Sequence, residues 1–207
     1  MKRVVITGAG ISGLFLANLL RQDSEYQVMI YEKNNSINLE KGYGIQLSVN
    51  SIKLLNEVGF KNINSKDKFH PNKLDFYSLK NKKKICDLDI SFFNDNDLKY
   101  TTLARSILLK FLKDKLPGNL INYNKRIVEV EKSLQKININ FKDNSSIECD
   151  YLIVCDGVFS STRPLIVNRH TKPKYFNSIA IRATVEKNVV ENLNYNNISL
   201  SLGSNLH

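Results

Sequence analysis

The feature that most constrains the fold is a glycine-rich turn at residues 8–13, with the pattern GxGxxG. The residues before it, 4–6, are β-branched and apolar, which predicts a buried strand. Residues 28–31 predict a second strand, which ends directly before Glu32. Between the turn and that strand, apolar side chains recur at helical spacing. They are Ile11, Leu14, Phe15 and Leu19. The order of strand, glycine turn, helix, strand and acid is typical of a unit that binds a dinucleotide.

Each residue type in this unit has a physical role. Gly8 permits the tight turn, Gly10 lets a pyrophosphate approach the backbone, and Gly13 lets the helix pack close to the sheet. The N-terminus of the helix offers N–H groups and a partial positive charge to the phosphates. Glu32 is placed to accept hydrogen bonds from an adenosine ribose. An acid here repels a 2′-phosphate, which disfavours NADP and leaves FAD and NAD open.

The N-terminus has a competing interpretation as a signal peptide, because Met1, Lys2 and Arg3 precede an apolar stretch. Glycine and polar residues interrupt that stretch, and no small-x-small cleavage site follows before Arg21. The dinucleotide-binding turn accounts for every one of these interruptions. We therefore expect a cytoplasmic protein without a leader.

Composition excludes several classes of protein. The chain has 207 residues and a net charge of +10, and its densest basic run, residues 80–84, carries no aromatic residues for base stacking. We expect no nucleic-acid partner. The three cysteines, an odd number, fit a reducing compartment and show no CxxC spacing, so no metal site is expected. No apolar run is long enough to span a bilayer.

The rest of the chain predicts further elements around this unit. A glycine-rich segment at 42–48 leads into a helix at 50–58, and a second helix follows residues 98–105 and ends at Pro117. Residues 74–79 and 85–88 predict a hairpin. A three-stranded antiparallel meander is expected next, followed by a buried strand that returns to the parallel sheet. These four strands are residues 127–130, 137–141, 147–149 and 151–155.

Four separated motifs together resemble the FAD-dependent aromatic hydroxylases, the single-component flavoprotein monooxygenases typified by p-hydroxybenzoate and salicylate hydroxylases. The motifs are residues 4–32, 42–50, 103–108 and 151–163. Their order and spacing match along essentially the whole chain. The resemblance implies an α/β fold. It consists of a Rossmann-like FAD-binding domain, with a parallel sheet and the meander, followed by the start of a mainly β substrate domain.

The resemblance also implies which residues hold FAD. The glycine turn with Ser12 would hold the pyrophosphate, Glu32 the adenosine ribose, and Val128 the adenine. Gly44 and Ile45 would lie near the flavin, Arg105 would neutralise the pyrophosphate or ribityl chain, and the Asp-Gly pair would brace the site. Arg163 could serve the site or form a structural ion pair. The implied cofactor-binding set is Gly8, Gly10, Ile11, Ser12, Gly13, Glu32, Lys33, Gly44, Ile45, Arg105, Val128, Asp156 and Gly157.

The implied reaction is hydroxylation of a small aromatic substrate through a C4a-hydroperoxyflavin, with NAD(P)H as co-substrate. The resemblance names no catalytic base in this chain. Tyr43, His70 and Arg182 are polar candidates near the implied pocket, each with a structural or surface role as its alternative. The family's downstream Gly-Asp motif has no counterpart after Arg163, so we expect an N-terminal portion of a hydroxylase.

The chain is expected to divide into four regions. They are a first FAD-binding segment (1–72), a substrate-domain hairpin (73–98), a second FAD-binding segment (99–174) and an incomplete substrate-domain sheet (175–207). Residues 179–185 and 198–202 predict strands of that sheet. Its open edge predicts self-association of the isolated chain.

Two alternatives to a monooxygenase remain open. One is a non-catalytic module that binds FAD or another adenine dinucleotide. The other is an NAD-dependent dehydrogenase, against which the meander and the Asp156-Gly157 pair argue, because such domains continue with strand–helix units.

Overall fold

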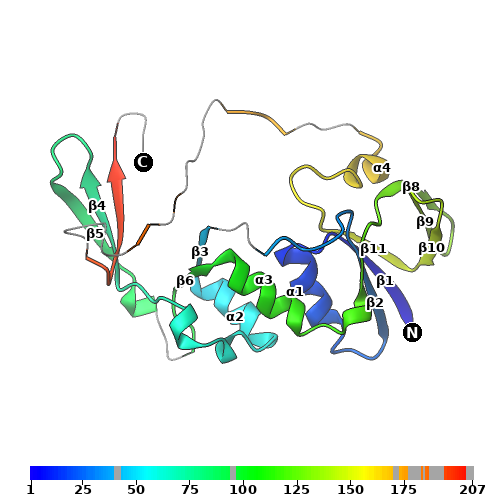
Figure 1. Ribbon diagram of the computed structural model, residues 1–207, viewed down its shortest axis with the longest axis horizontal. Coiled ribbons are helices and arrows are strands. Elements are labelled where there is room, and N and C mark those ends of the chain that lie inside the picture. The colour runs from blue at the N-terminus through cyan, green and yellow to red at the C-terminus, as the bar shows by residue number, and fades with distance from the viewer. Residues whose placement is uncertain are drawn as a thin grey trace. The chain divides into compact units, whose positions relative to one another are not determined.

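The computed structural model forms two compact units (Figure 1). The first contains Met1–Lys41 and Leu108–Ala180, and the second contains Gly42–Ile107 and Ile181–His207. The structure describes residues 1–39, 43–93, 97–169, 173–176, 183, 185–186 and 194–203. The four sequence-based domain boundaries stay a prediction.

A parallel sheet forms the centre of the first unit. Its strands are β1 (Lys2–Thr7), β2 (Tyr26–Tyr31), β7 (Ile121–Asn122) and β11 (Tyr151–Val154), in the order β11-β1-β2-β7. All three pairings are parallel. Helix α1 (Ile11–Leu20) connects β1 to β2, and Val4, Val5 and Ile6 are buried in the core. The predicted order of strand, glycine turn, helix, strand and acid is confirmed.

Strand β11 returns to the parallel sheet beside β1, as the sequence predicts. The prediction that this strand is buried is wrong. Tyr151 is 50% exposed, and Leu152, Ile153 and Val154 are only partly covered. The reason is its position, because β11 is an edge strand with one neighbour in the described sheet. A continuous apolar run identifies a strand but not how many neighbours cover it.

The predicted meander is present in the first unit. It consists of β8 (Ile127–Lys132), β9 (Ile137–Phe141) and β10 (Ser146–Cys149), paired antiparallel in the order β10-β9-β8. Its inward side chains pack against the parallel sheet, and the rings of Tyr31 and Phe141 stack with centroids 4.7 Å apart. This shared core fixes the start of β8 close to the end of β2.

Two further helices complete the description of the first unit. Helix α3 (Arg105–Asp114) begins in the second unit and ends in the first. The Asn18 amide of α1 donates to the carbonyls of Leu14 and Leu112, at 2.9 and 2.8 Å, and so ties α1 to the end of α3. The short helix α4 (Arg163–Val167) follows β11.

The second unit contains two small sheets. Strand β3 (Gly44–Leu47) pairs antiparallel with β6 (Thr101–Ala104), and helix α2 (Val49–Glu57) follows β3. The other sheet has the order β12-β4-β5, from β12 (Ile198–Leu202), β4 (Lys73–Ser78) and β5 (Lys84–Asp89). The predicted hairpin and the predicted strand at 198–202 are confirmed, and β12 runs parallel to β4. Short 3-10 turns lie at Phe60–Asn62, Ser65–Asp67 and Ser91–Phe93.

Buried Asp75 links the three strands of this second sheet. Its carboxylate is 2% exposed and lies 2.7 Å from the Lys84 ammonium and 2.7 Å from the Asn197 amide that donates to it. Gly42, Arg182 and most of the predicted strand at 179–185 lie outside the described residues. Among the helices that are described, none has the length and apolar character needed to cross a membrane.

Candidate functional site

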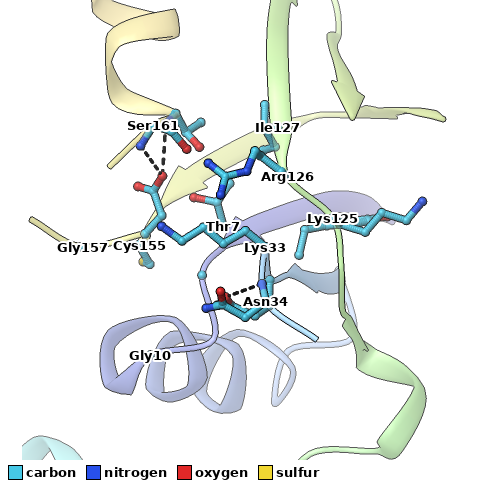
Figure 2. Close-up of a pocket in the computed structure, with 15 residues that line it drawn as sticks. Thr7, Gly10, Lys33, Asn34, Lys125, Arg126, Ile127, Cys155, Gly157 and Ser161 are labelled. Carbon is cyan, nitrogen blue, oxygen red and sulfur yellow. Dashed lines mark hydrogen bonds between the residues drawn. The ribbon is translucent and has the colours of Figure 1, made fainter. Parts of the chain in front are cut away.

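A pocket of about 220 Å³ lies in the first unit, at the carboxyl ends of β1, β2 and β11. Figure 2 shows the glycine turn on one side and the Ser161 segment on the other. In open parallel sheets, ligands bind beyond the carboxyl ends of the strands, as they would here. Six residues of the predicted cofactor-binding set line this pocket. They are Gly8, Gly10, Glu32, Lys33, Asp156 and Gly157.

The three glycines of the turn meet different surroundings. A Cβ at Gly8, where φ is +91°, would lie 2.6 Å from the Cys155 carbonyl oxygen. A Cβ at Gly13 would lie 2.0 Å from the Gly8 carbonyl oxygen. These two positions therefore need glycine for the turn and the helix packing. Gly10 differs, because a Cβ there would meet no atom within 4 Å, so its missing side chain leaves room in the pocket.

Helix α1 begins directly at this open side. Its N-cap residue, Gly10, provides no side-chain cap, and the first turn carries no acidic residue. The positive end of the helix is therefore not neutralised by a side chain of its own first turn. Ile11 and Ser12 lie in that first turn, beside the pocket residue Gly10. A glycine-lined helix N-terminus of this kind suits phosphate oxygens.

Glu32 is anchored at the end of β2. It is 8% exposed, and its Oε2 accepts a hydrogen bond from the Ala9 N–H at 2.8 Å. Its Oε1 accepts from the backbone and side-chain nitrogens of Asn34, at 3.0 and 2.7 Å. A carboxylate offers about four lone-pair positions. Glu32 can therefore brace the glycine turn and still accept a hydrogen bond from a ligand hydroxyl.

Asp156 organises the opposite wall. Its Oδ2 accepts hydrogen bonds from the N–H groups of Ser161 and Thr162, each at 3.1 Å (Figure 2). Its Oδ1 is buried and has no hydrogen-bond partner among the described residues, and the same holds for Thr7 Oγ1. An unsatisfied buried polar atom costs about 1–3 kcal/mol. Both residues line the pocket, so a polar ligand there would supply the missing partners.

Cationic side chains surround the rest of the pocket. Figure 2 shows Lys33 and Arg126 extending over it, whereas Lys125 points away. The Lys125 ammonium instead binds Asp143 at 2.6 Å and Ser145 at 2.7 Å. The sequence-based prediction missed Arg126. The available signal was a basic pair directly before a strand that was expected to carry an adenine contact.

The structure does not bring Val128 to this pocket. Val128 is 46% exposed, and its neighbour Ile127 is buried and lines the pocket instead. Adjacent residues of a strand face opposite sides, so only one of the two can face the ligand. Of these two residues of β8, Ile127 lines the pocket, and the adenine contact of Val128 stays a prediction.

The thiol beside this site is not an activated nucleophile. Cys155 lines the pocket, and burial raises the pKa of its thiol, with the Asp156 carboxylate raising it further. The thiolate is therefore disfavoured at neutral pH.

Within the described residues, the Arg163 side chain forms no ion pair, and its backbone N–H donates to Ser160 Oγ at 2.9 Å.

Gly44, Ile45 and Arg105 belong to the second unit. The β3–β6 pairing sets Gly44 opposite Ala104, and the Arg105 N–H donates to the Tyr43 carbonyl at 3.0 Å. The ladder thus brings the predicted flavin-side residues together on neighbouring strand ends. Their contact with a cofactor stays a prediction. His70 lies in a different pocket of this unit, with Nδ1 3.1 Å from Thr101 Oγ1.

Comparison with known proteins identifies the family. Residues 1–198 match the family described as FAD binding domain, and the chain belongs to that family. The predicted resemblance to FAD-dependent aromatic hydroxylases is confirmed by the relatives it matches. The family's cofactor is FAD, as the sequence predicts.

The matched relatives include proteins named as monooxygenases and hydroxylases. The chain is 26% identical to 6-hydroxynicotinate 3-monooxygenase of Pseudomonas fluorescens, over 87% of this chain and 47% of that protein. It is 24% identical to salicylate hydroxylase of Pseudomonas putida, over 89% of this chain and 43% of that protein. The chain therefore spans about half the length of the curated relatives it matches.

Solved structures agree on the fold. The 2,6-dihydroxypyridine-3-hydroxylase of Arthrobacter nicotinovorans matches with a TM-score of 0.69 at 18% identity, over 84% of this chain and 41% of that one. Klebsiella pneumoniae HpxO, solved in complex with FAD and uric acid, matches with a TM-score of 0.67 at 23% identity, over 79% and 41%. Both confirm the predicted α/β class with a parallel sheet and antiparallel strands.

Proposed function

We propose that this chain is the cofactor-binding portion of an FAD-dependent monooxygenase that hydroxylates a small aromatic or heteroaromatic ring. The observation that carries the proposal is the pocket of the first unit. Its open Gly10, uncapped α1 terminus and anchored Glu32 suit the adenosine and pyrophosphate half of FAD. NAD(P)H as the reductant and a ring-shaped substrate belong to the same proposal.

The chain's own residues would orient and hold the cofactor. The N–H groups at the start of α1 bind the pyrophosphate, and Glu32 accepts a ribose hydroxyl. Thr7 Oγ1 and Asp156 Oδ1, both buried and without a partner in the described part of the chain, gain polar contacts from the ligand. When bound, FAD supplies the redox chemistry, and the protein supplies position and exclusion of water.

The size of the pocket favours one alternative. Its volume of about 220 Å³ lies below the range of about 300–1,000 Å³ that is usual for drug-sized ligands. The first unit thus suits one half of a dinucleotide rather than all of it. The second candidate is a non-catalytic FAD-binding module, for which this half of the cofactor site is sufficient. Gly44, Ile45 and Arg105, which the sequence predicts to lie near the flavin, belong to the second unit, and their part in flavin binding is a separate proposal. A dehydrogenase is disfavoured by the meander and by membership of the family.

The first experiment is a visible absorption spectrum of the purified chain with added FAD. A perturbed spectrum at one FAD per chain, lost in Gly10→Val, supports FAD binding at this turn. A matched control is Gly118→Val, because a Cβ at Gly118 would also meet no atom within 4 Å but would lie outside the pocket. An unperturbed flavin spectrum from a folded chain would contradict retention of the cofactor by this chain.

A second measurement separates the monooxygenase from the module. NAD(P)H oxidation by the FAD-loaded chain, stimulated by an aromatic or heteroaromatic acid, supports the monooxygenase. Tight FAD binding without NAD(P)H oxidation is expected both of the module and of a cofactor-binding portion that needs the rest of the enzyme, so that result supports FAD binding alone. The cytoplasmic location predicted from the sequence belongs to this proposal and is tested by cell fractionation.

A further inference from the structure

A second pocket, of about 160 Å³, lies entirely within the second unit. It is formed by α2, the segment after it and the entry to β6. This volume is well below the range of about 300–1,000 Å³ that is typical of cofactor-sized sites. The pocket therefore suits a small ion rather than a nucleotide.

The charges around this pocket are mainly positive. Among the described residues, Lys61, Lys68 and Lys99 line it, against one acidic residue, Asp97. In the described ranges, none of the three ammonium groups forms an ion pair with a carboxylate. His70 also lines the pocket, and its pKa is lowered by burial and further by the charges of Lys99 and Lys68. The positive charges of these lysines therefore act together on the interior of the pocket.

Lys68 is held in position at this pocket. Its ammonium donates to the Lys61 carbonyl at 3.2 Å and lies 5.6 Å from the centre of the Phe60 ring. Burial lowers its pKa. Because partial burial strengthens electrostatic contacts, an anion here would interact more strongly than with a lysine in open solvent.

Asn56 adds a polar acceptor to the cations. Its Nδ2 donates to the Asp97 carbonyl at 3.0 Å, which fixes the orientation of the amide. Its Oδ1 is buried and has no hydrogen-bond partner in the described part of the chain. The pocket thus combines several cations with one unsatisfied acceptor. An anion that also carries a proton would complement both.

We propose that this pocket binds inorganic phosphate, with the lysines neutralising its charge and a P–O–H group donating to Asn56 Oδ1. Sulfate at neutral pH carries no proton to donate. A phosphate monoester has a second pKa of about 6, so at about pH 8 it is almost entirely a dianion without a P–O–H. Inorganic hydrogen phosphate keeps one such proton. The proposal does not depend on flavin binding.

The test is isothermal titration of the whole chain at about pH 8 and constant ionic strength with phosphate, sulfate and methyl phosphate, a monoester without a hydroxyl group. Phosphate is expected to bind at least about tenfold more tightly than the other two, because only phosphate satisfies the acceptor. Lys99→Ala should weaken phosphate binding about tenfold, and Lys61→Ala similarly. Lys80→Ala is the control, since Lys80 is an exposed lysine of the same unit outside the pocket.

Three results would overturn the proposal. The first is no detectable heat with phosphate at millimolar concentration. The second is equal affinity for phosphate and sulfate, which removes the role of Asn56. The third is binding that survives Lys61→Ala and Lys99→Ala, which would locate the anion elsewhere, for example at the glycine turn. Circular dichroism of each variant verifies that it is folded.

Discussion

The two compact units stabilise buried and partly buried acidic groups by different means. In the first unit, Glu32 and Asp156 accept hydrogen bonds mainly from backbone N–H groups, and the Asn34 amide on Glu32 is the one side-chain donor among the described residues. In the second, Asp75 depends on the side chains of Lys84 and Asn197. Backbone donors are present whatever the side chain, whereas side-chain donors depend on residue identity. The first arrangement is thus robust to substitution, except where a glycine is required.

The largest loss of stability is expected at Gly13, one of the positions that require glycine. In Gly13→Ala, the new Cβ would lie 2.0 Å from the Gly8 carbonyl oxygen, so the turn or the helix must shift. We expect loss of at least about 3 kcal/mol of stability, the upper range for overpacked sites. Urea denaturation followed by circular dichroism measures this. Wild-type stability in Gly13→Ala would mean that the helix packs less closely than the structure shows.

The second-largest loss of stability is expected at Asp75, whose carboxylate depends on side-chain partners. Lys84→Met removes the ammonium 2.7 Å from buried Asp75, while Lys125→Met removes the ammonium 2.6 Å from Asp143, which is half exposed. We expect Lys84→Met to lower the melting temperature clearly more than Lys125→Met, because exposed ion pairs contribute little. Thermal denaturation of both variants measures the two melting temperatures. Equal shifts would contradict the importance of burial at Asp75.

The contribution of Asp75 to stability depends on pH, because its carboxylate must be charged to pair with the Lys84 ammonium. Contacts with Lys84 and Asn197 hold the pKa of the Asp75 carboxyl below its usual range. Its contribution to stability is therefore present above the unfolded value of about 3.9 and is lost as pH falls through the lowered folded pKa. Urea denaturation followed by circular dichroism, at pH values from neutral to acid, measures this contribution. In Asp75→Asn, this contribution to the acid dependence should disappear.

A smaller effect on stability, but a specific effect on the ligand, is expected at Gly10. Gly10→Ala places a Cβ where no protein atom lies within 4 Å, so stability should change by less than about 1 kcal/mol. FAD affinity should fall about tenfold or more if the pyrophosphate approaches this backbone. Denaturation of this variant measures its stability, and FAD titration measures its affinity for FAD. Unchanged FAD affinity would place the pyrophosphate elsewhere.

How far the sequence predicts the structure also divides between the two units. The pattern of the glycine turn and Glu32 is encoded locally in residues 8–32, although Gly8 also packs against the Cys155 carbonyl from a distant strand. The link between Asp75, Lys84 and Asn197 spans more than a hundred residues and leaves no periodic signal. The exposure of β11 was missed because the number of neighbouring strands is a tertiary property. For the same reason, the choice between Ile127 and Val128 depended on the strand's orientation.

The smallest expected effect concerns the edge of the second sheet. In the described sheet, β12 has β4 on one side only, and Leu202 on it is 40% exposed. An edge strand with apolar side chains is a template for pairing with another chain, so we expect the isolated chain to self-associate weakly.

Leu202→Lys should reduce this self-association, because a charge on the edge strand opposes pairing. The control variant Leu134→Lys, on a fully exposed turn between β8 and β9, should leave it unchanged. Size-exclusion chromatography across a concentration series reports the difference. A chain that elutes as a monomer at every concentration would mean that the edge is already protected, and that the polar Ser199 and Ser201 between its apolar positions are sufficient to prevent pairing.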